Sequence, residues 1–183
     1  MLAYVYVLIA ICVRLFSALG YIGTMGFVPL EASMLFFGSR MPRKHFLVAV
    51  ALLIGTDIYL TTQRYGMPLN WDQGIIWAWY LGVFFLGSVL KGRVKPLYVG
   101  GVAIGSALSF FLVSNFAVWL AGTLYPRTLE GLSAAYVAAL PFFGKGVLAN
   151  LTFCAIFFGL PVLFPALSDS AAHDEAVKSV ATN

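Results

Sequence analysis

The sequence has little charge, histidine or cysteine, and each scarcity excludes a class of protein. Only 10% of its 183 residues are charged, whereas a soluble domain is about a quarter charged. The histidines, His45 and His173, and the cysteines, Cys12 and Cys154, stand far apart in the chain. Neither a metal site nor a disulfide framework is therefore predicted. We interpret both cysteines as buried apolar side chains.

Catalytic signatures are missing as well. The sequence contains no His-Glu-x-x-His, no Gly-x-Ser-x-Gly and no glycine-rich phosphate loop with a lysine, the patterns that mark common hydrolases and nucleotide-binding enzymes. We therefore expect no enzymatic activity and no cofactor. The net charge of +4 comes from basic residues in short loops between apolar runs, so nucleic acid is not an expected partner.

What the sequence has in abundance is apolar surface. Hydrophobic residues make up 61% of the chain, and the mean hydropathy is +0.93. A helix of about 20 residues crosses the hydrocarbon core of a membrane. The chain predicts an all-α membrane protein with six transmembrane helices, at residues 2–19, 27–37, 46–60, 74–90, 97–122 and 147–164.

The two ends of the chain differ in character. The first run carries no basic stretch before it and has Arg14 inside it, so we interpret it as a retained first helix and not as a cleaved signal peptide. Residues 1–167 form the predicted integral membrane domain. Residues 168–183 form a polar tail that we expect to be disordered and cytoplasmic.

The stretch 128–143 decides the helix count. Thr128 suits a helix N-cap and Glu130 a first turn, while Pro141 interrupts the far end. A segment this short predicts an interfacial or re-entrant helix before the last crossing. The alternative is a seventh crossing.

Loop charges predict the orientation. Two of the predicted loops carry six basic residues, namely Arg40, Arg43, Lys44, Lys91, Arg93 and Lys95. The other loops together carry only three, Arg64, Arg127 and Lys145. Basic loops stay in the cytoplasm. Both termini of this expected inner-membrane protein are then cytoplasmic.

Five runs carry a polar group in their outer half, and we predict that these groups face a cavity opening outward. They are Arg14, Glu31, Asp57, Asn115 and Asn150. For Asp57 and Asn150, snorkelling at helix ends is the alternative. For Arg14 and Glu31, the alternative to a ligand contact is an internal ion pair. Asn115 is placed deepest, and an interhelical hydrogen bond is its alternative.

Aromatic residues accompany these polar groups. Asn115 and Trp119 share a helix face with Phe111, and an amide between rings suits a flat heterocyclic or otherwise amphipathic ligand. For the other aromatic residues near the predicted outer surface, the favoured interpretation is an interfacial belt and not a ligand contact. They are Tyr65, Trp71, Trp77, Trp79, Tyr80 and Tyr125.

Small residues recur along the run 97–122, at Gly101, Gly105 and Ser109 and at Ala103 and Ala107. They allow close helix approach. Packing within the bundle is the favoured interpretation, and docking of an energising module or an envelope partner is the alternative.

Several motifs resemble an uncharacterised family of small bacterial membrane proteins, a domain of unknown function. They are Asn-Phe-x-x-Trp at 115–119, Tyr-Pro-x-Thr-x-x-Gly-Leu at 125–132 and Pro-Phe-Phe at 141–143, with weaker matches at 27–32 and 53–57. The resemblance covers most of the chain.

That family is similar to the substrate-binding S components of energy-coupling-factor transporters, which have six helices, cytoplasmic termini and an outward-facing pocket. The resemblance implies capture of a small vitamin-like compound. Asn115 and Trp119 would contact it, Tyr125, Arg127 and Glu130 would belong to a lid, and Arg14, Glu31, Asp57 and Asn150 would line or brace the cavity. The rival interpretation is a non-transporting envelope scaffold.

Overall fold

The computed structural model describes residues 1–21, 27–122 and 124–164, and within them the chain forms helices and no strand. The helices are α1 (Leu2–Ala18), α2 (Leu30–Arg40), α3 (Phe46–Tyr59), α4 (Gln73–Ser88), α5 (Pro96–Ala121) and α6 (Leu129–Leu163). A 3₁₀ turn, η1 (Arg43–His45), precedes α3, and a π-helical turn, η2 (Leu60–Arg64), extends it. The all-α prediction is confirmed for the described residues. The predicted tail at 168–183 lies outside them.

Local sequence signals set the helix ends. Pro96 occupies the first turn of α5, where its missing N–H costs nothing, and Gly122 ends that helix in the left-handed conformation at φ 70°. The hydroxyl of Thr128 accepts a hydrogen bond from the Gly131 N–H at 3.1 Å, so Thr128 is the N-cap expected from the sequence. Pro42 follows α2 in an extended conformation and blocks its continuation.

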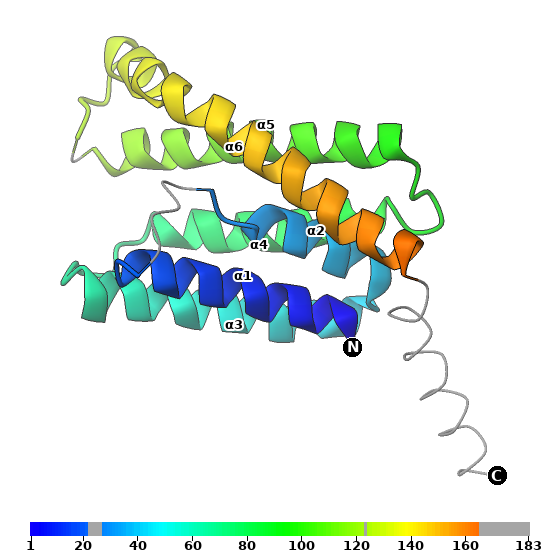
Figure 1. Cartoon of the computed structure of the whole chain (residues 1–183). Coiled ribbons are helices and arrows are strands. Elements are labelled where there is room, and N and C mark those ends of the chain that lie inside the picture. The colour runs from blue at the N-terminus through cyan, green and yellow to red at the C-terminus, as the bar shows by residue number, and fades with distance from the viewer. Residues whose placement is uncertain (22–26, 123, 165–183) are drawn as a thin grey trace.

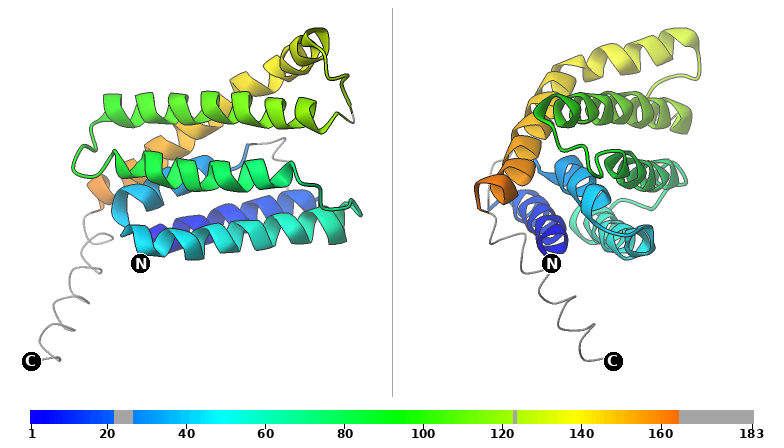
Figure 2. Two further views of the ribbon diagram at one scale, coloured as in Figure 1. Left: turned by 180° about the vertical axis from the view of Figure 1, so that it is seen from behind. Right: turned by 90° about the vertical axis from the view of Figure 1, so that its right-hand side faces the viewer.

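The helices lie in three layers, with α2 near the centre (Figures 1 and 2). α1 and α3 form one layer, α2 and α4 the next, and α5 and α6 the third. α2 contacts α1, α4, α5 and α6, and residues 32–39 are all buried. A helix that is buried all round cannot show an amphipathic stripe, so its short sequence gives no sign of this central position.

α2 and α4 approach each other more closely than side chains allow. A Cβ on Gly38 would fall on the carbonyl oxygen of Phe84, and a Cβ on Gly87 would fall on that of Leu35. The two glycines therefore set the spacing between the helices. Around them, Phe37 stacks edge-on against Phe46 and Phe84, which closes the core.

α6 corrects two predictions. The stretch 128–143 is not a separate short helix, because it continues through Pro141 into the last helix as one element of 35 residues. Figure 2 shows that α6 bends partway along its length. Pro141 lacks the N–H that would bond to the Val137 carbonyl, the usual cause of such a bend. Lys145 consequently lies inside α6 and not in a loop.

One end of the bundle collects the basic loops; we call it the basic end (residues 40–45 and 89–95). Lys91 Nζ donates to the Met41 carbonyl at 2.9 Å, which joins the two loops. The Tyr4 hydroxyl bonds His45 Nδ1 at 2.7 Å, which places the start of α1 there. The C-terminal end of α6 lies at the same end (Figure 1). The opposite, distal end comprises residues 19–21, 65–72, 122 and 124–128.

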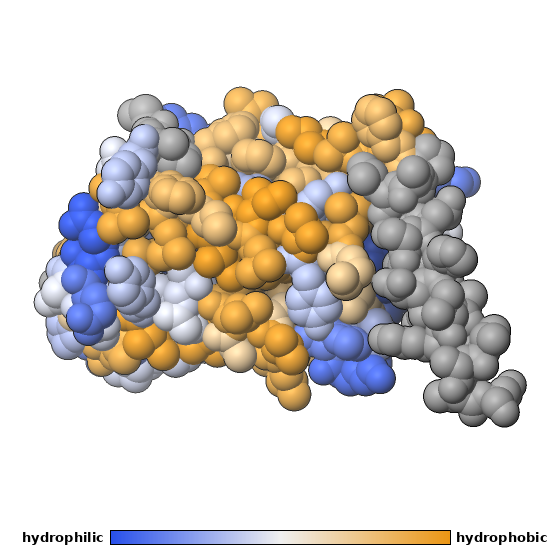
Figure 3. All heavy atoms as spheres, turned by 60° about the horizontal axis from the view of Figure 1, so that its bottom comes forward, coloured by the Kyte–Doolittle hydropathy of each residue, from blue (hydrophilic) through white to orange (hydrophobic). Residues whose placement is uncertain are grey.

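The outer surface of the bundle is strongly apolar. Figure 3 shows apolar side chains across the middle of one face and hydrophilic ones gathered toward its two ends. By length and composition, three helical stretches could cross a membrane, namely Arg43–Arg64, Pro96–Ala121 and Leu129–Leu163. α1 and α4 are apolar but shorter.

Two smaller expectations are settled by burial. Cys154 is buried as predicted, whereas Cys12 is exposed on α1. Along α5, Ala103 and Ala107 are buried in the bundle. Gly101 and Gly105 face open space, so only part of the small-residue stripe serves internal packing.

Candidate functional site

A cavity of about 670 Å³ runs from the distal end to the middle of the bundle. This volume is within the range of small-molecule sites, about 300–1,000 Å³. Its wall includes seven aromatic side chains, Trp77, Trp79, Tyr80, Phe110, Phe111, Phe142 and Phe143. Five of the nine predicted site residues line it, namely Arg14, Glu31, Asp57, Asn115 and Asn150.

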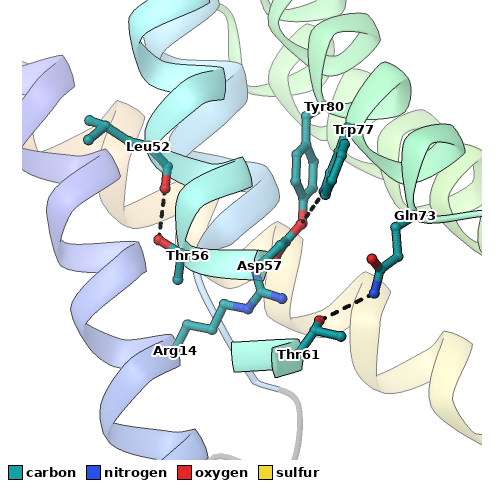
Figure 4. A network of polar contacts seen from close by, with 8 residues as sticks. All are labelled: Arg14, Leu52, Thr56, Asp57, Thr61, Gln73, Trp77 and Tyr80. Atoms are coloured by element: carbon teal, nitrogen blue, oxygen red, sulfur yellow. Dashed lines mark hydrogen bonds and ion pairs between the residues drawn. The ribbon is translucent and has the colours of Figure 1, made fainter. Parts of the chain in front are cut away.

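Asp57 organises one wall of the cavity (Figure 4). Arg14 forms an ion pair with Asp57 Oδ1. Asp57 Oδ2 accepts hydrogen bonds from the Tyr80 hydroxyl at 2.9 Å and from Trp77 Nε1 at 3.1 Å. This buried carboxylate therefore joins α1, α3 and α4, and the charge of Arg14 is compensated by Asp57. Arg14 therefore forms an internal ion pair, the alternative considered for it, and its partner is Asp57 and not Glu31.

Two residues at the start of α4 offer free acceptors near the distal end. Gln73 Nε2 donates to the Thr61 hydroxyl at 3.3 Å. Among the described residues, neither Asp72 Oδ1 nor Gln73 Oε1 receives a hydrogen bond, although both atoms are buried. Because a buried acceptor without a donor is costly, these atoms favour the entry of a donor-bearing ligand or water.

Glu31 lies in the first turn of α2, where the helix dipole favours a negative charge. Its Oε2 accepts hydrogen bonds from Ser106 Oγ at 3.0 Å and from Asn150 Nδ2 at 2.9 Å. Asn150 Nδ2 also donates to the Ala103 carbonyl at 2.8 Å. Three helices thus meet at Glu31, and Asn150, only 3% exposed, is fixed by these bonds.

The depth order of the polar groups differs from the prediction. Ser106, which contacts Glu31, lies about 22 Å along α5 from the end at Ala121, close to the middle of that helix. Asn115 lies only about 9 Å from the same end. Glu31 and Asn150 are therefore the deepest groups, and Asn115 is nearer the distal end. No sequence pattern indicates this order, because it depends on α2 beginning in the interior of the bundle.

Asn115 and Trp119 do not act as a pair. The Asn115 amide donates to the Phe111 carbonyl one turn earlier at 2.7 Å. Among the residues that the structure describes, it forms no interhelical hydrogen bond, and Asn115 lines the cavity. The Trp119 indole N–H instead bonds the Pro126 and Thr128 carbonyls, each at 3.1 Å. Trp119 therefore braces the turn after α5 and does not line the cavity.

The predicted lid residues are also placed outside the cavity wall. Tyr125, Arg127 and Glu130 do not line it. Arg127 Nη2 donates to the Ala121 carbonyl at 3.4 Å, across the end of α5. A Cβ on Gly131 would fall on the Pro126 carbonyl oxygen, so the segment 124–128 packs tightly against the first turn of α6.

Of the six residues of the predicted aromatic belt, Tyr125 is half-buried and the other five divide into two groups. Tyr65 and Trp71 are exposed at the distal end, as a belt requires. Trp79 and Tyr80 are buried, and Trp77 donates to Asp57. Trp79 Nε1 donates to Ser109 Oγ at 3.0 Å. For Trp77, Trp79 and Tyr80 the belt interpretation is therefore wrong.

Two charged residues, Asp72 and Lys145, line the cavity without having been predicted from the sequence, and Lys145 is the one in the interior of a helix. It lies on the edge of the α6 stripe formed by Phe142, Gly146 and Ala149, which also line the cavity. The neighbouring Pro141, Gly144 and Gly146 favoured a loop there. The signal available in the sequence was the hydrophobic periodicity, which continues across these residues.

Comparison with known proteins gives a family but no function. Residues 1–171 match the family described as a family of unknown function, DUF6580. No curated protein and no solved structure matches the chain.

Proposed function

Since the chain belongs to the DUF6580 family, which has no known function, we propose a function from its own cavity. We propose that it is an integral membrane protein of the substrate-binding S-component type. It captures a small, vitamin-like amphipathic compound from the outer face of the membrane. The observation that carries the proposal is the cavity, because it holds aromatic and hydrogen-bonding groups from all six helices.

Support for the membrane comes from the exposed surface. Large apolar side chains are exposed along the bundle, for example Leu47 at 69% and Leu148 at 61%, and the polar ends flank them (Figure 3). Lipid accommodates such a surface, whereas water does not. Six segments cross in this proposal. α2 has 11 residues and covers only about half of the hydrocarbon core, so it forms the inner half of its crossing.

The orientation predicts an all-or-none labelling result. With Lys145 inside α6, the basic end carries six loop cations and the distal end carries Arg64 and Arg127, so the basic end should be cytoplasmic. In a background without Cys12 and Cys154, a cysteine at Gly66 should react with an impermeant maleimide on spheroplasts. A cysteine at Gly92 should react only after lysis. Labelling of Gly92 in intact spheroplasts would reverse the orientation.

Capture of a compound is tested by blocking the cavity. Gly146 lines the cavity and Gly144 does not, and a Cβ at either position meets no atom within 4 Å. The two glycines share a helix, so the same substitution changes helix propensity equally. We expect detergent-purified wild-type protein to retain a small molecule in native mass spectrometry. Gly146→Trp should lose it and Gly144→Trp should keep it.

The comparison of the two variants decides what the cavity does. Equal retention by both variants would mean that the compound is held elsewhere, for example as a bound lipid. A wild-type protein that carries no small molecule would leave the cavity without a captured compound and would count against the proposal. Thermal unfolding of both variants checks that the fold survives.

A further inference from the structure

Glu31 offers the cavity an uncompensated carboxylate. Among the described residues its Oε1 accepts no hydrogen bond, and the single ion pair there joins Arg14 to Asp57. The side chains that hold Oε2, Ser106 and Asn150, are neutral. A carboxylate at mid-depth of an apolar bundle requires a partner. A cation from outside the chain would supply it.

Lys145 offers an uncompensated ammonium at the same depth. On α6, Lys145 lies between Phe143 and Asn150. The Phe143 ring is 4.8 Å from that of Phe111 on α5, and the Asn150 amide donates to the Ala103 carbonyl on α5. Lys145 is therefore level with the middle of α5. Lys145 lines the cavity and forms no ion pair with any of the residues described. A lysine inside a helix at this depth is rare unless it has a function.

Glu31 and Lys145 face one cavity from α2 and α6 without pairing with each other. One further carboxylate lines the cavity, Asp72, at the start of α4 near the distal end. The Arg14–Asp57 pair is neutral as a unit. The deep part of the cavity therefore presents one free negative and one free positive group. Aromatic rings surround the rest.

We propose that the captured compound is zwitterionic, with an ammonium group on Glu31, a carboxylate on Lys145 and a flat apolar body among the aromatic side chains. One such ligand compensates the half-buried Glu31 and the exposed Lys145 at once, whereas a cation or an anion leaves the other charge unpaired. The rings suit the flat body by stacking. This inference rests on the proposed function and names the substrate class of the same cavity.

Four probes with one indole body separate the charge contributions. Tryptophan carries both charges, tryptamine the ammonium, indole-3-propionate the carboxylate, and indole-3-ethanol neither. Binding to the purified protein is measured by thermal stabilisation at rising probe concentration. We expect tryptophan to bind most tightly, by about tenfold over either singly charged probe.

Variants then assign each charge to its residue. Glu31→Gln should remove the advantage of tryptophan over indole-3-propionate, and Lys145→Met should remove its advantage over tryptamine. Asp72→Asn removes another carboxylate from the same cavity and should leave the ranking unchanged. If a neutral variant fails to fold, Glu31→Asp and Lys145→Arg should retain the wild-type ranking. The ranking of the four probes on the wild-type protein tests the inference even if every variant fails to fold.

Each outcome decides the inference. If indole-3-ethanol or a singly charged probe binds as tightly as tryptophan, the zwitterion is wrong while capture of a small molecule stands. The same holds if Asp72→Asn alone changes the ranking. If no probe binds, the charge of the compound retained in native mass spectrometry decides the inference: a zwitterion supports it, and a compound of any other charge contradicts it. If no probe binds and no compound is retained, the proposed function fails with the inference.

Discussion

Asp57→Asn should be among the most destabilising single substitutions in this chain, lowering the free energy of unfolding by about 3–5 kcal/mol. The Asp57 side chain is only 11% exposed, and its carboxylate accepts hydrogen bonds from Tyr80 and Trp77 while pairing with Arg14. An amide keeps the shape but removes the charge. Arg14 then remains inside the bundle without a counter-charge, and that uncompensated charge is the main cost.

The measurement is the thermal unfolding midpoint in detergent, with an expected fall on the order of 10 °C. Glu130→Gln is the control, because Glu130 is an exposed carboxylate on α6, and it should unfold with the wild type. The double variant Arg14→Met with Asp57→Leu should recover much of the loss, since it removes both charges. An Asp57→Asn variant as stable as the wild type would show that the pair is not buried in the folded protein.

Gly38→Ala and Gly87→Ala should each destabilise the bundle by about 1–3 kcal/mol, the usual cost of overpacking a core. Each added methyl group would meet a backbone carbonyl of the facing helix. A backbone carbonyl cannot change rotamer as a side chain can, so α2 and α4 must move apart to accommodate the methyl group. Because α2 carries Glu31, that movement should also weaken capture of the compound.

Gly82→Ala is the matched control on α4, since its Cβ would meet no atom within 4 Å. There the same substitution should stabilise the helix by up to about 1 kcal/mol, because alanine is the better helix former. Thermal unfolding should therefore shift in opposite directions for Gly82 and for the two contact glycines. A shift of the same sign at all three positions would contradict the close approach of α2 and α4.

The helical elements could be predicted to within a few residues because their causes are local. The apolar runs, Pro96, Gly122 and Thr128 fix where helices begin and end, whatever the rest of the chain does. The same reasoning failed at α6. Pro141 and its neighbouring glycines weaken a helix without ending it when packing against α5 supports both halves, and that support is not a property of the segment itself.

The candidate site was predictable only in part. Five of the polar residues predicted to face a cavity do line one, because burying a polar group in an apolar run is costly wherever it sits. Their partners were not predictable. Glu31 bonds Asn150 from a position 119 residues away in the chain, and Arg14 pairs with Asp57 across 43 residues.

The sequence by itself determined that the described part of the chain is helical, that its surface is apolar and that polar groups within five apolar runs line a cavity. Composition, hydropathy and capping are properties of short segments. The tertiary structure alone decided that α2 starts in the interior, that Trp77 and Tyr80 turn inward to Asp57, and that Lys145 faces the cavity opposite Glu31. Those outcomes depend on how each helix is rotated and how deeply it sits. Contacts between distant residues set rotation and depth, and no local pattern records them.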